Sequence, residues 1–148
     1  MDHWGLEWEY GRSVCENNAR LECVSNVRFV DGSASKLPFG DASVDVVMSC
    51  LSFHEVRDTL EKEKSVAEAL RVLKQGGRFV FLDLFDDPKF YPDPGKLGDT
   101  IARAGASVTE NKPLRDLLPL PFPLNIGRSL KFARIVAGIK AGSTAQRP

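Results

Sequence analysis

A histidine followed directly by a glutamate, His54-Glu55, is the pair in this sequence best suited to acid–base chemistry. An imidazole can remove a proton from a substrate hydroxyl or amine at near-neutral pH. A single histidine beside an apolar run is more often structural, so both roles stay open. Glu55 could pair with His54 or cap a following helix, where exposed backbone NH groups favour a carboxylate, and capping is the more common role.

The segments before this pair predict where it lies. The run Val44–Met48 is almost continuously apolar, as expected for a strand covered on both faces of a parallel sheet. An earlier run, Val27–Val30, is β-branched and aromatic and leads into turn formers at 31–33. The sequence therefore predicts two strands, each followed by small polar residues.

Helical patterns flank these predicted strands. Apolar and small residues recur at helical spacing over residues 9–22, which predicts an amphipathic helix. A second helix is predicted over 57–75, with Gly76-Gly77 as its C-terminal stop. It leads into the apolar strand Arg78–Asp83, which ends at an acidic residue, so strand, helix and strand form one βαβ unit.

The rest of the chain continues the alternation. After a proline-rich loop, the pattern predicts a helix over Gly95–Ala104, a strand over Ala106–Glu110 and a last strand over Ser129–Lys140. The apolar, proline-rich stretch Leu117–Ile126 could form a lid or a partner groove, although packing over the sheet edge is more common. The order predicts an α/β fold whose parallel sheet has helices on both faces and binds ligands at the carboxyl ends of its strands.

Two separated strings carry a family resemblance. Residues 32–39, GSASKLPF, and 43–47, SVDVV, resemble the pattern GDAxxLPFxDxSFDxV of class I S-adenosylmethionine-dependent methyltransferases. Residues 68–78, EALRVLKQGGR, resemble the ExxRVLKPGGR segment before the fifth strand of the same family. The nearest group is that of the ubiquinone and menaquinone biosynthesis enzymes, and the likeness covers roughly residues 1–83, then more loosely to Lys140.

The resemblance implies S-adenosyl-L-methionine as cofactor and assigns it five contact residues. Asp2 falls where the family has the carboxylate that accepts both ribose hydroxyls, and Ser33 where it has an aspartate at the adenine amino group. Ala34 would contribute its backbone NH, and Ser49 and Cys50 would line the methyl-transfer pocket. Two plainer interpretations remain open, a disordered terminal residue for Asp2 and a simple turn residue for Ser33.

The largest departure from the family is the glycine-rich loop, which nothing in this chain resembles. In the family that loop lets the backbone approach the cofactor's methionine end at a helix N-terminus. The family sheet has the order 3-2-1-4-5-7-6 with an antiparallel last strand. We therefore expect residues 1–140 to form a partial, Rossmann-like domain without the first strand and most of the second, and 141–148 to be a flexible tail.

Composition excludes several classes of protein. The 148 residues are 43% hydrophobic and 27% charged, as in one ordinary globular domain. Twenty basic and twenty acidic residues cancel, and no basic stripe suggests nucleic-acid binding. No apolar run reaches the ~18 residues of a membrane span. The start of the chain resembles no signal peptide, so we expect a cytoplasmic protein.

The three cysteines do not indicate a metal site. Cys15, Cys23 and Cys50 are odd in number and lack a CxxC spacing, and neither His3 nor His54 completes a ligand set with them. We predict no metal and three reduced thiols that serve as packing residues.

Three hypotheses for function follow. The first is methyl transfer to a small-molecule acceptor by in-line attack on the sulfonium methyl, where positioning dominates and the missing loop impairs activity. The second is a non-catalytic remnant that binds or assembles, as a homodimer, through strand edges left unpaired at 27–30 and 44–48. The third is a late start codon, with ~40–60 further residues upstream.

Overall fold

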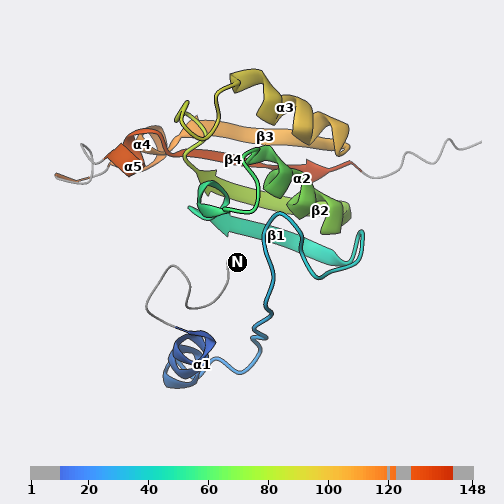
Figure 1. Ribbon diagram of the computed structural model, residues 1–148, viewed down its shortest axis with the longest axis vertical. Helices are drawn as coiled ribbons and strands as arrows, with labels where there is room; N and C mark the ends of the chain where they lie inside the picture. The colour runs from blue at the N-terminus through green and yellow to red at the C-terminus, as the bar shows by residue number, and fades with distance from the viewer. Residues whose placement is uncertain (1–10, 120, 123–127, 142–148) are drawn as a thin grey trace, which may run out of the picture.

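The centre of the protein is a four-stranded sheet, seen in a computed structural model that describes residues 11–119, 121–122 and 128–141. The strands lie in the order β1-β2-β4-β3 (Figure 1). They are β1 Val44–Cys50, β2 Leu73–Asp83, β3 Ala106–Pro113 and β4 Arg134–Lys140.

Strand direction follows the predicted family pattern. β1 and β2 are parallel, and β4 runs antiparallel to both of its neighbours, β2 and β3. This arrangement corresponds to the positions 4-5-7-6 of the predicted sheet. The prediction of an antiparallel last strand is therefore confirmed.

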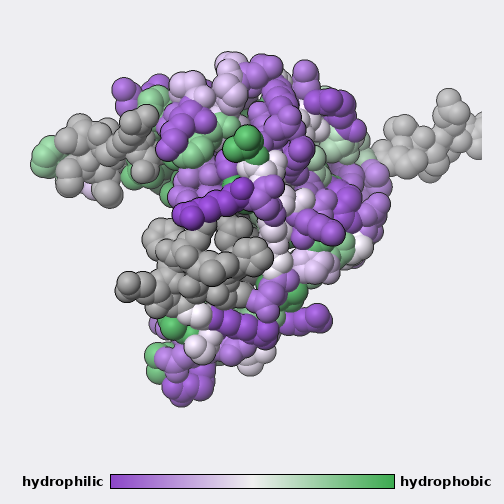
Figure 2. Space-filling view, in the orientation of Figure 1, coloured by the Kyte–Doolittle hydropathy of each residue, from purple (hydrophilic) through white to green (hydrophobic). Residues whose placement is uncertain are grey.

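Two helices pack on one face of this sheet. α2 (Glu63–Val72) connects β1 to β2, and α3 (Pro94–Arg103) connects β2 to β3. Right-handed crossovers that step in the same direction along a sheet place their helices on the same face. The core lies beneath them and is built from fully buried side chains, the largest of which are Phe79, Phe81, Leu70 and Leu73. In Figure 2 the surface over α2 and α3 is mainly hydrophilic.

The opposite face of the sheet is less covered than the prediction of helices on both faces implies. Val46, Met48 and Val80 point to that side and are 55%, 76% and 38% exposed. α1 (Arg12–Leu21) lies apart from the sheet and contains no buried residue (Figure 1). In the described part of the chain no crossover steps in the other direction, so no crossover helix covers this face. At one end of it Leu82 and Ile135 form a small cluster with Leu114 and Leu130, which lie in two short helices.

The predicted strand at Val27–Val30 is wrong. These residues belong to no strand, and Val27 is half exposed. A strand needs a hydrogen-bonded neighbour, and β-propensity supplies none by itself. Before β1, the described chain forms one isolated antiparallel β-bridge, between Ser33 and Lys36.

Other boundaries shift by several residues. The helix predicted over 57–75 begins at Glu63 and ends at Val72, because β2 starts at Leu73, before the two glycines. Gly76 adopts φ +75°, and a Cβ on Gly77 would lie 2.6 Å from the Leu73 side chain and 2.9 Å from the Asp45 carbonyl oxygen. The glycine pair therefore permits a turn and a close approach within β2, not a helix stop.

The C-terminal third contains two short helices that the sequence did not predict. They are α4 (Leu114–Leu117) and α5 (Arg128–Lys131), so the last strand starts at Arg134 rather than at residue 129. β3 extends three residues beyond the predicted end, to Pro113. Half of the apolar stretch 117–126 and the predicted tail after 141 lie outside the described residues.

Two further observations concern the length of the helices and the cysteines of the described residues. No helix among them is long and apolar enough to cross a bilayer. The three cysteines are unpaired, with Cys15 half-buried and Cys23 and Cys50 exposed, so the packing role predicted for the latter two is wrong.

Candidate functional site

The carboxyl ends of β1 and β2 meet at one edge of the sheet, because the two strands are parallel and Cys50 pairs with Leu82. The short 3-10 helix η1 (Phe53–Glu55) follows β1, and Asp83 ends β2. We call residues 50–55 and 83–84 the β1–β2 rim. In open α/β sheets this is the edge at which ligands bind.

A fully buried carboxylate lies at the centre of the rim. Asp83 Oδ2 accepts hydrogen bonds from the backbone NH of Phe53 at 2.7 Å and of His54 at 3.3 Å. Its Oδ1 accepts from the Leu84 NH at 2.7 Å and lies 2.5 Å from His54 Nδ1. Asp83 therefore ties η1 to the end of β2 and contacts the predicted catalytic histidine.

His54 is enclosed on three sides. Its Nδ1 faces Asp83, its Nε2 lies 3.1 Å from Glu55 Oε1, and the Phe90 ring packs 5.1 Å from its own. The hydrogen bond to Asp83 raises the pKa of His54 above its usual 6.5, while burial opposes the rise and Glu55 adds to it. Of the two roles weighed for Glu55, the structure shows the pairing with His54.

The charge on His54 should make stability depend on pH. A group whose pKa rises on folding stabilises the folded state below its unfolded pKa and loses that effect as pH rises through the folded value. The wild type should therefore exceed His54→Asn in free energy of unfolding most at pH 5–6, with the gap closing above pH 6.5. Urea unfolding across this range measures it, and a pH-independent gap would contradict the assignment.

The residues predicted at the adenine end lie in a tight turn. Ser33 Oγ accepts the Ser35 NH at 3.2 Å and lies 3.0 Å from Ser35 Oγ, which donates to Asp58 at 2.6 Å. Ala34 is buried in the core. The described contacts thus show Ser33 as a turn residue. Its hydroxyl could still make one further hydrogen bond. Asp2 lies outside the described residues.

The residues predicted at the methyl-transfer end lie on opposite faces of β1. Ser49 points to the helix-covered face, where its Oγ is buried and has no hydrogen-bond partner among the described residues. Cys50 is exposed. Leu51, the next residue, has φ +50°, a conformation that costs energy for a branched side chain and is found most often near functional sites. The buried Ser49 hydroxyl has no partner among the described residues and lies two residues before the strained Leu51, as expected for a rim that binds a polar ligand.

A charged clamp that the sequence did not predict joins the two family strings. Glu68 accepts the Leu37 NH at 2.8 Å and both Arg71 Nε and Nη2 at 2.7 Å. Arg71 also donates to the Phe39 carbonyl at 2.8 Å and to the Asp41 carboxylate. The pKa of Glu68 is held below its ordinary value, chiefly by Arg71. The ExxR spacing puts both side chains on one face of α2, against the loop that leads into β1.

Removing the clamp should loosen this loop. We expect Arg71→Ala to lower the free energy of unfolding clearly more than the control variant below, because several charge-assisted hydrogen bonds are lost at a partly exposed site. Lys74→Ala, which removes one exposed ion pair with Asp45, is the matched control and should cost at most about 0.5 kcal/mol. Equal losses in urea unfolding would show that the clamp is not structural.

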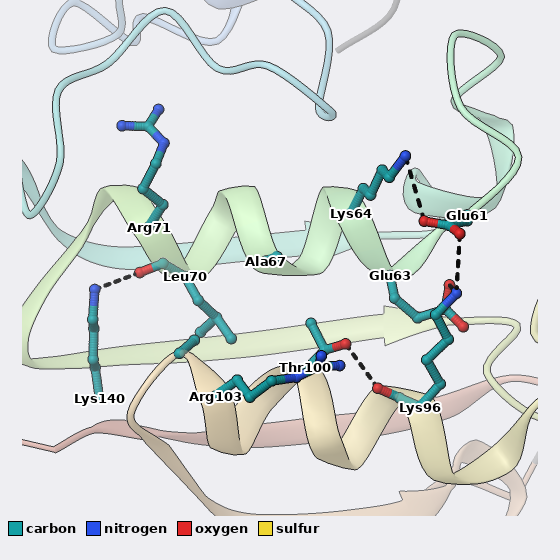
Figure 3. Close-up of a pocket in the computed structure, with 11 residues that line it drawn as sticks. Glu61, Glu63, Lys64, Ala67, Leu70, Arg71, Lys96, Thr100, Arg103 and Lys140 are labelled. Atoms are coloured by element: carbon teal, nitrogen blue, oxygen red, sulfur yellow. Dashed lines mark hydrogen bonds and ion pairs between the residues drawn. The ribbon is translucent and has the colours of Figure 1, made fainter.

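A concavity of about 470 Å³ lies between α2 and α3 (Figure 3). Most of its charges have internal partners: Glu61 pairs with Lys64 and Lys96, and Lys140 donates to the Leu70 and Leu73 carbonyls. None of the predicted site residues lines it. In the described chain no three His, Cys, Asp or Glu side chains are grouped so as to hold a metal ion.

Comparison with known sequences points to one family. The profile of the methyltransferase domain family matches residues 8–81, half of the chain. The uncharacterized methyltransferase YcgJ of Bacillus subtilis is 40% identical over 77 residues, which are 51% of this chain and 29% of that protein. The ubiquinone/menaquinone biosynthesis C-methyltransferase UbiE of Stutzerimonas stutzeri is 47% identical over 58 residues, 39% of this chain and 22% of that protein. The chain thus matches less than a third of the length of these curated relatives.

Solved structures agree on the fold. The crystal structure of YcgJ superposes with a TM-score of 0.57 and 21% identity, over 87% of this chain and 77% of that one. The cyclase SpnF superposes with a TM-score of 0.62 and 16% identity, over 88% and 62%. At these identities the likeness shows the fold alone, which confirms the predicted Rossmann-like class. With its two motif strings, its sheet order and the family match, the chain belongs to the class I methyltransferases that use S-adenosyl-L-methionine.

Proposed function

We propose that the chain takes part in transfer of a methyl group from S-adenosylmethionine to a small-molecule acceptor at the β1–β2 rim. The observation that carries this proposal is the contact of the buried Asp83 with the partly buried His54, at the sheet edge where α/β proteins bind ligands. The cofactor, when bound, supplies an electrophilic methyl carbon. His54 Nε2 would accept the acceptor's proton as the acceptor attacks.

The proposed cofactor contacts are those that the family resemblance assigns. Asp2 would accept the ribose hydroxyls, Ser33 and the Ala34 NH would contact the adenine, and Ser49 and Cys50 would line the methyl end. The Ser49 hydroxyl, buried without a partner in the described structure, supports this placement. Residues 1–140 would then act as one partial domain. Without a glycine-rich loop, we expect affinity below that of a complete domain.

Binding of S-adenosylhomocysteine, followed by titration calorimetry, tests the cofactor site without knowledge of the acceptor. We expect saturable binding that Asp2→Ala weakens about tenfold and Ser33→Ala by about threefold to tenfold, because each removes a hydrogen-bond acceptor from the ligand. Ser107→Ala, in β3 and far from the rim, is the matched control and should bind as the wild type does. A folded chain that shows no binding would reject the proposal for this chain.

A second candidate function has its own observation. β1 is an edge strand with one neighbour in the described sheet, and the adjoining face exposes Val46, Met48 and Val80. Open strand edges and apolar faces promote association. A non-catalytic binding or assembly module, as a homodimer through this edge, would use that surface. Sedimentation equilibrium tests it: dimerisation without cofactor binding favours the module, and a monomer at all concentrations excludes it.

The balanced charge supports a small-molecule rather than a nucleic-acid partner. We also propose a cytoplasmic location, for which composition and the reduced cysteines are the support.

A further inference from the structure

We propose that Asp83 is a positioning residue that holds His54 with its proton on Nδ1, and that Glu55 occupies Nε2 until an acceptor displaces it. The proposal rests on the proposed function, in which His54 accepts the acceptor's proton. It adds Asp83, which the sequence did not assign to the site, and it gives a role to Glu55, which the sequence analysis weighed only as a partner of His54 or a helix cap.

The first step concerns the carboxylate of Asp83. Backbone NH groups of Phe53, His54 and Leu84 fill three of its acceptor positions, so it cannot turn away from the rim. An ionised carboxylate only accepts hydrogen bonds, and His54 Nδ1 lies 2.5 Å from Oδ1. The Nδ1 atom must therefore carry a proton, which leaves Nε2 as the atom able to accept one.

The second step concerns the orientation of the ring. The His54 NH binds the same carboxylate as the ring does, and the Phe90 ring packs at 5.1 Å with an interplanar angle of 53°. The His54 side chain is only 11% exposed. A ring held by two bonds to one buried group and by an aromatic neighbour presents Nε2 in one direction.

The third step concerns what faces Nε2. Glu55 Oε1 lies 3.1 Å away, and its side chain is 43% exposed, so it can move into solvent at little cost. The charged groups closest to the His54 ring are the carboxylates of Asp83 and Glu55. The Lys89 ammonium lies 4.8 Å from the centroid of the Phe90 ring, which packs against His54. Contact with both carboxylates favours the imidazolium, in which the Nε2 proton is donated to Glu55. An acceptor that displaces Glu55 removes one of these carboxylates, the Nε2 proton then passes to solvent, and Nε2 is able to accept the acceptor's own proton.

Nitrogen-15 NMR of the imidazole rings tests this on the wild-type chain without any ligand. The chain has two histidines, so His3→Asn assigns the His54 signals. We expect neutral His54 to carry its proton on Nδ1, the tautomer that free histidine disfavours. Glu55→Gln should lower the midpoint of the His54 titration without changing the tautomer, and Glu61→Gln, on the surface before α2, should change neither.

Two results would overturn the proposal: a proton on Nε2 in neutral wild-type His54, or an unchanged midpoint in Glu55→Gln. Asp83→Asn should change the ratio of the two His54 tautomers. If that variant does not fold, the tautomer of wild-type His54 and the titration midpoint in Glu55→Gln test the proposal without it. Binding of S-adenosylhomocysteine, measured on the same samples, reports separately on the proposed function. Intact binding together with either contrary result would reject only the roles of Asp83 and Glu55 and leave the proposed function standing.

Discussion

Gly138→Ala should lower the free energy of unfolding by about 3 kcal/mol or more, the largest loss we expect from adding one methyl group. Gly138 lies in β4, between Phe79 of β2 and Val108 of β3. A Cβ there would lie 2.1 Å from the Ser107 carbonyl oxygen and 2.6 Å from Phe79 Cζ. Neither the backbone of β3 nor a ring in the packed core can move aside cheaply.

Gly98→Ala is the matched control for this prediction. Gly98 lies within α3, and a Cβ at that position has open space around it. Alanine is the better helix former, so we expect a gain of about 0.5–1 kcal/mol. Urea unfolding followed by circular dichroism measures both variants. Wild-type stability in Gly138→Ala would show that β3 and β4 are not paired in this register.

Asp83→Ala should lower the free energy of unfolding by about 3–5 kcal/mol. The substitution leaves three backbone NH groups and the His54 ring without their shared acceptor in a buried place. Each buried donor left unsatisfied costs about 1–3 kcal/mol. Because the same carboxylate anchors η1 and orients His54, loss of stability and disorder of the rim should occur together.

Asp86→Ala, three residues farther along, is the control for this second prediction. Asp86 pairs with Arg134 at 2.7 Å, but its side chain is 36% exposed. Exposed ion pairs contribute about 0–1 kcal/mol, so its loss should be small. Comparable midpoints of thermal unfolding for the two alanine variants would mean that Asp83 does not anchor the rim.

The sheet could be predicted well where the pattern is local. β1, β2 and α3 were expected within a few residues of their observed bounds, because runs of apolar residues and glycine or proline breaks report on burial and chain reversal. Val27–Val30 has the composition of a strand, yet strand formation depends on a neighbour elsewhere in the chain. Pairing is a tertiary property, and a single segment does not encode it.

Only part of the site could be predicted from the sequence, because its other contacts also depend on the pairing of strands that lie far apart in the chain. His54 was identified from its residue type and its position after a strand. Asp83 was noticed only as an acidic strand end, because its contact with His54 spans 29 residues and depends on the register between β1 and β2. The ExxR string was recognised through the family likeness, but its action on the Leu37–Asp41 loop required the packed structure.

The most direct test of the central claim is a map of S-adenosylhomocysteine binding on the assigned proton–nitrogen NMR spectrum of the full chain. The account predicts saturable shifts at Ser33 and Ala34 and along the β1–β2 rim, with little change in the groove between α2 and α3. A folded spectrum that does not respond, or shifts confined to that groove, would contradict the claim that this rim is the cofactor site.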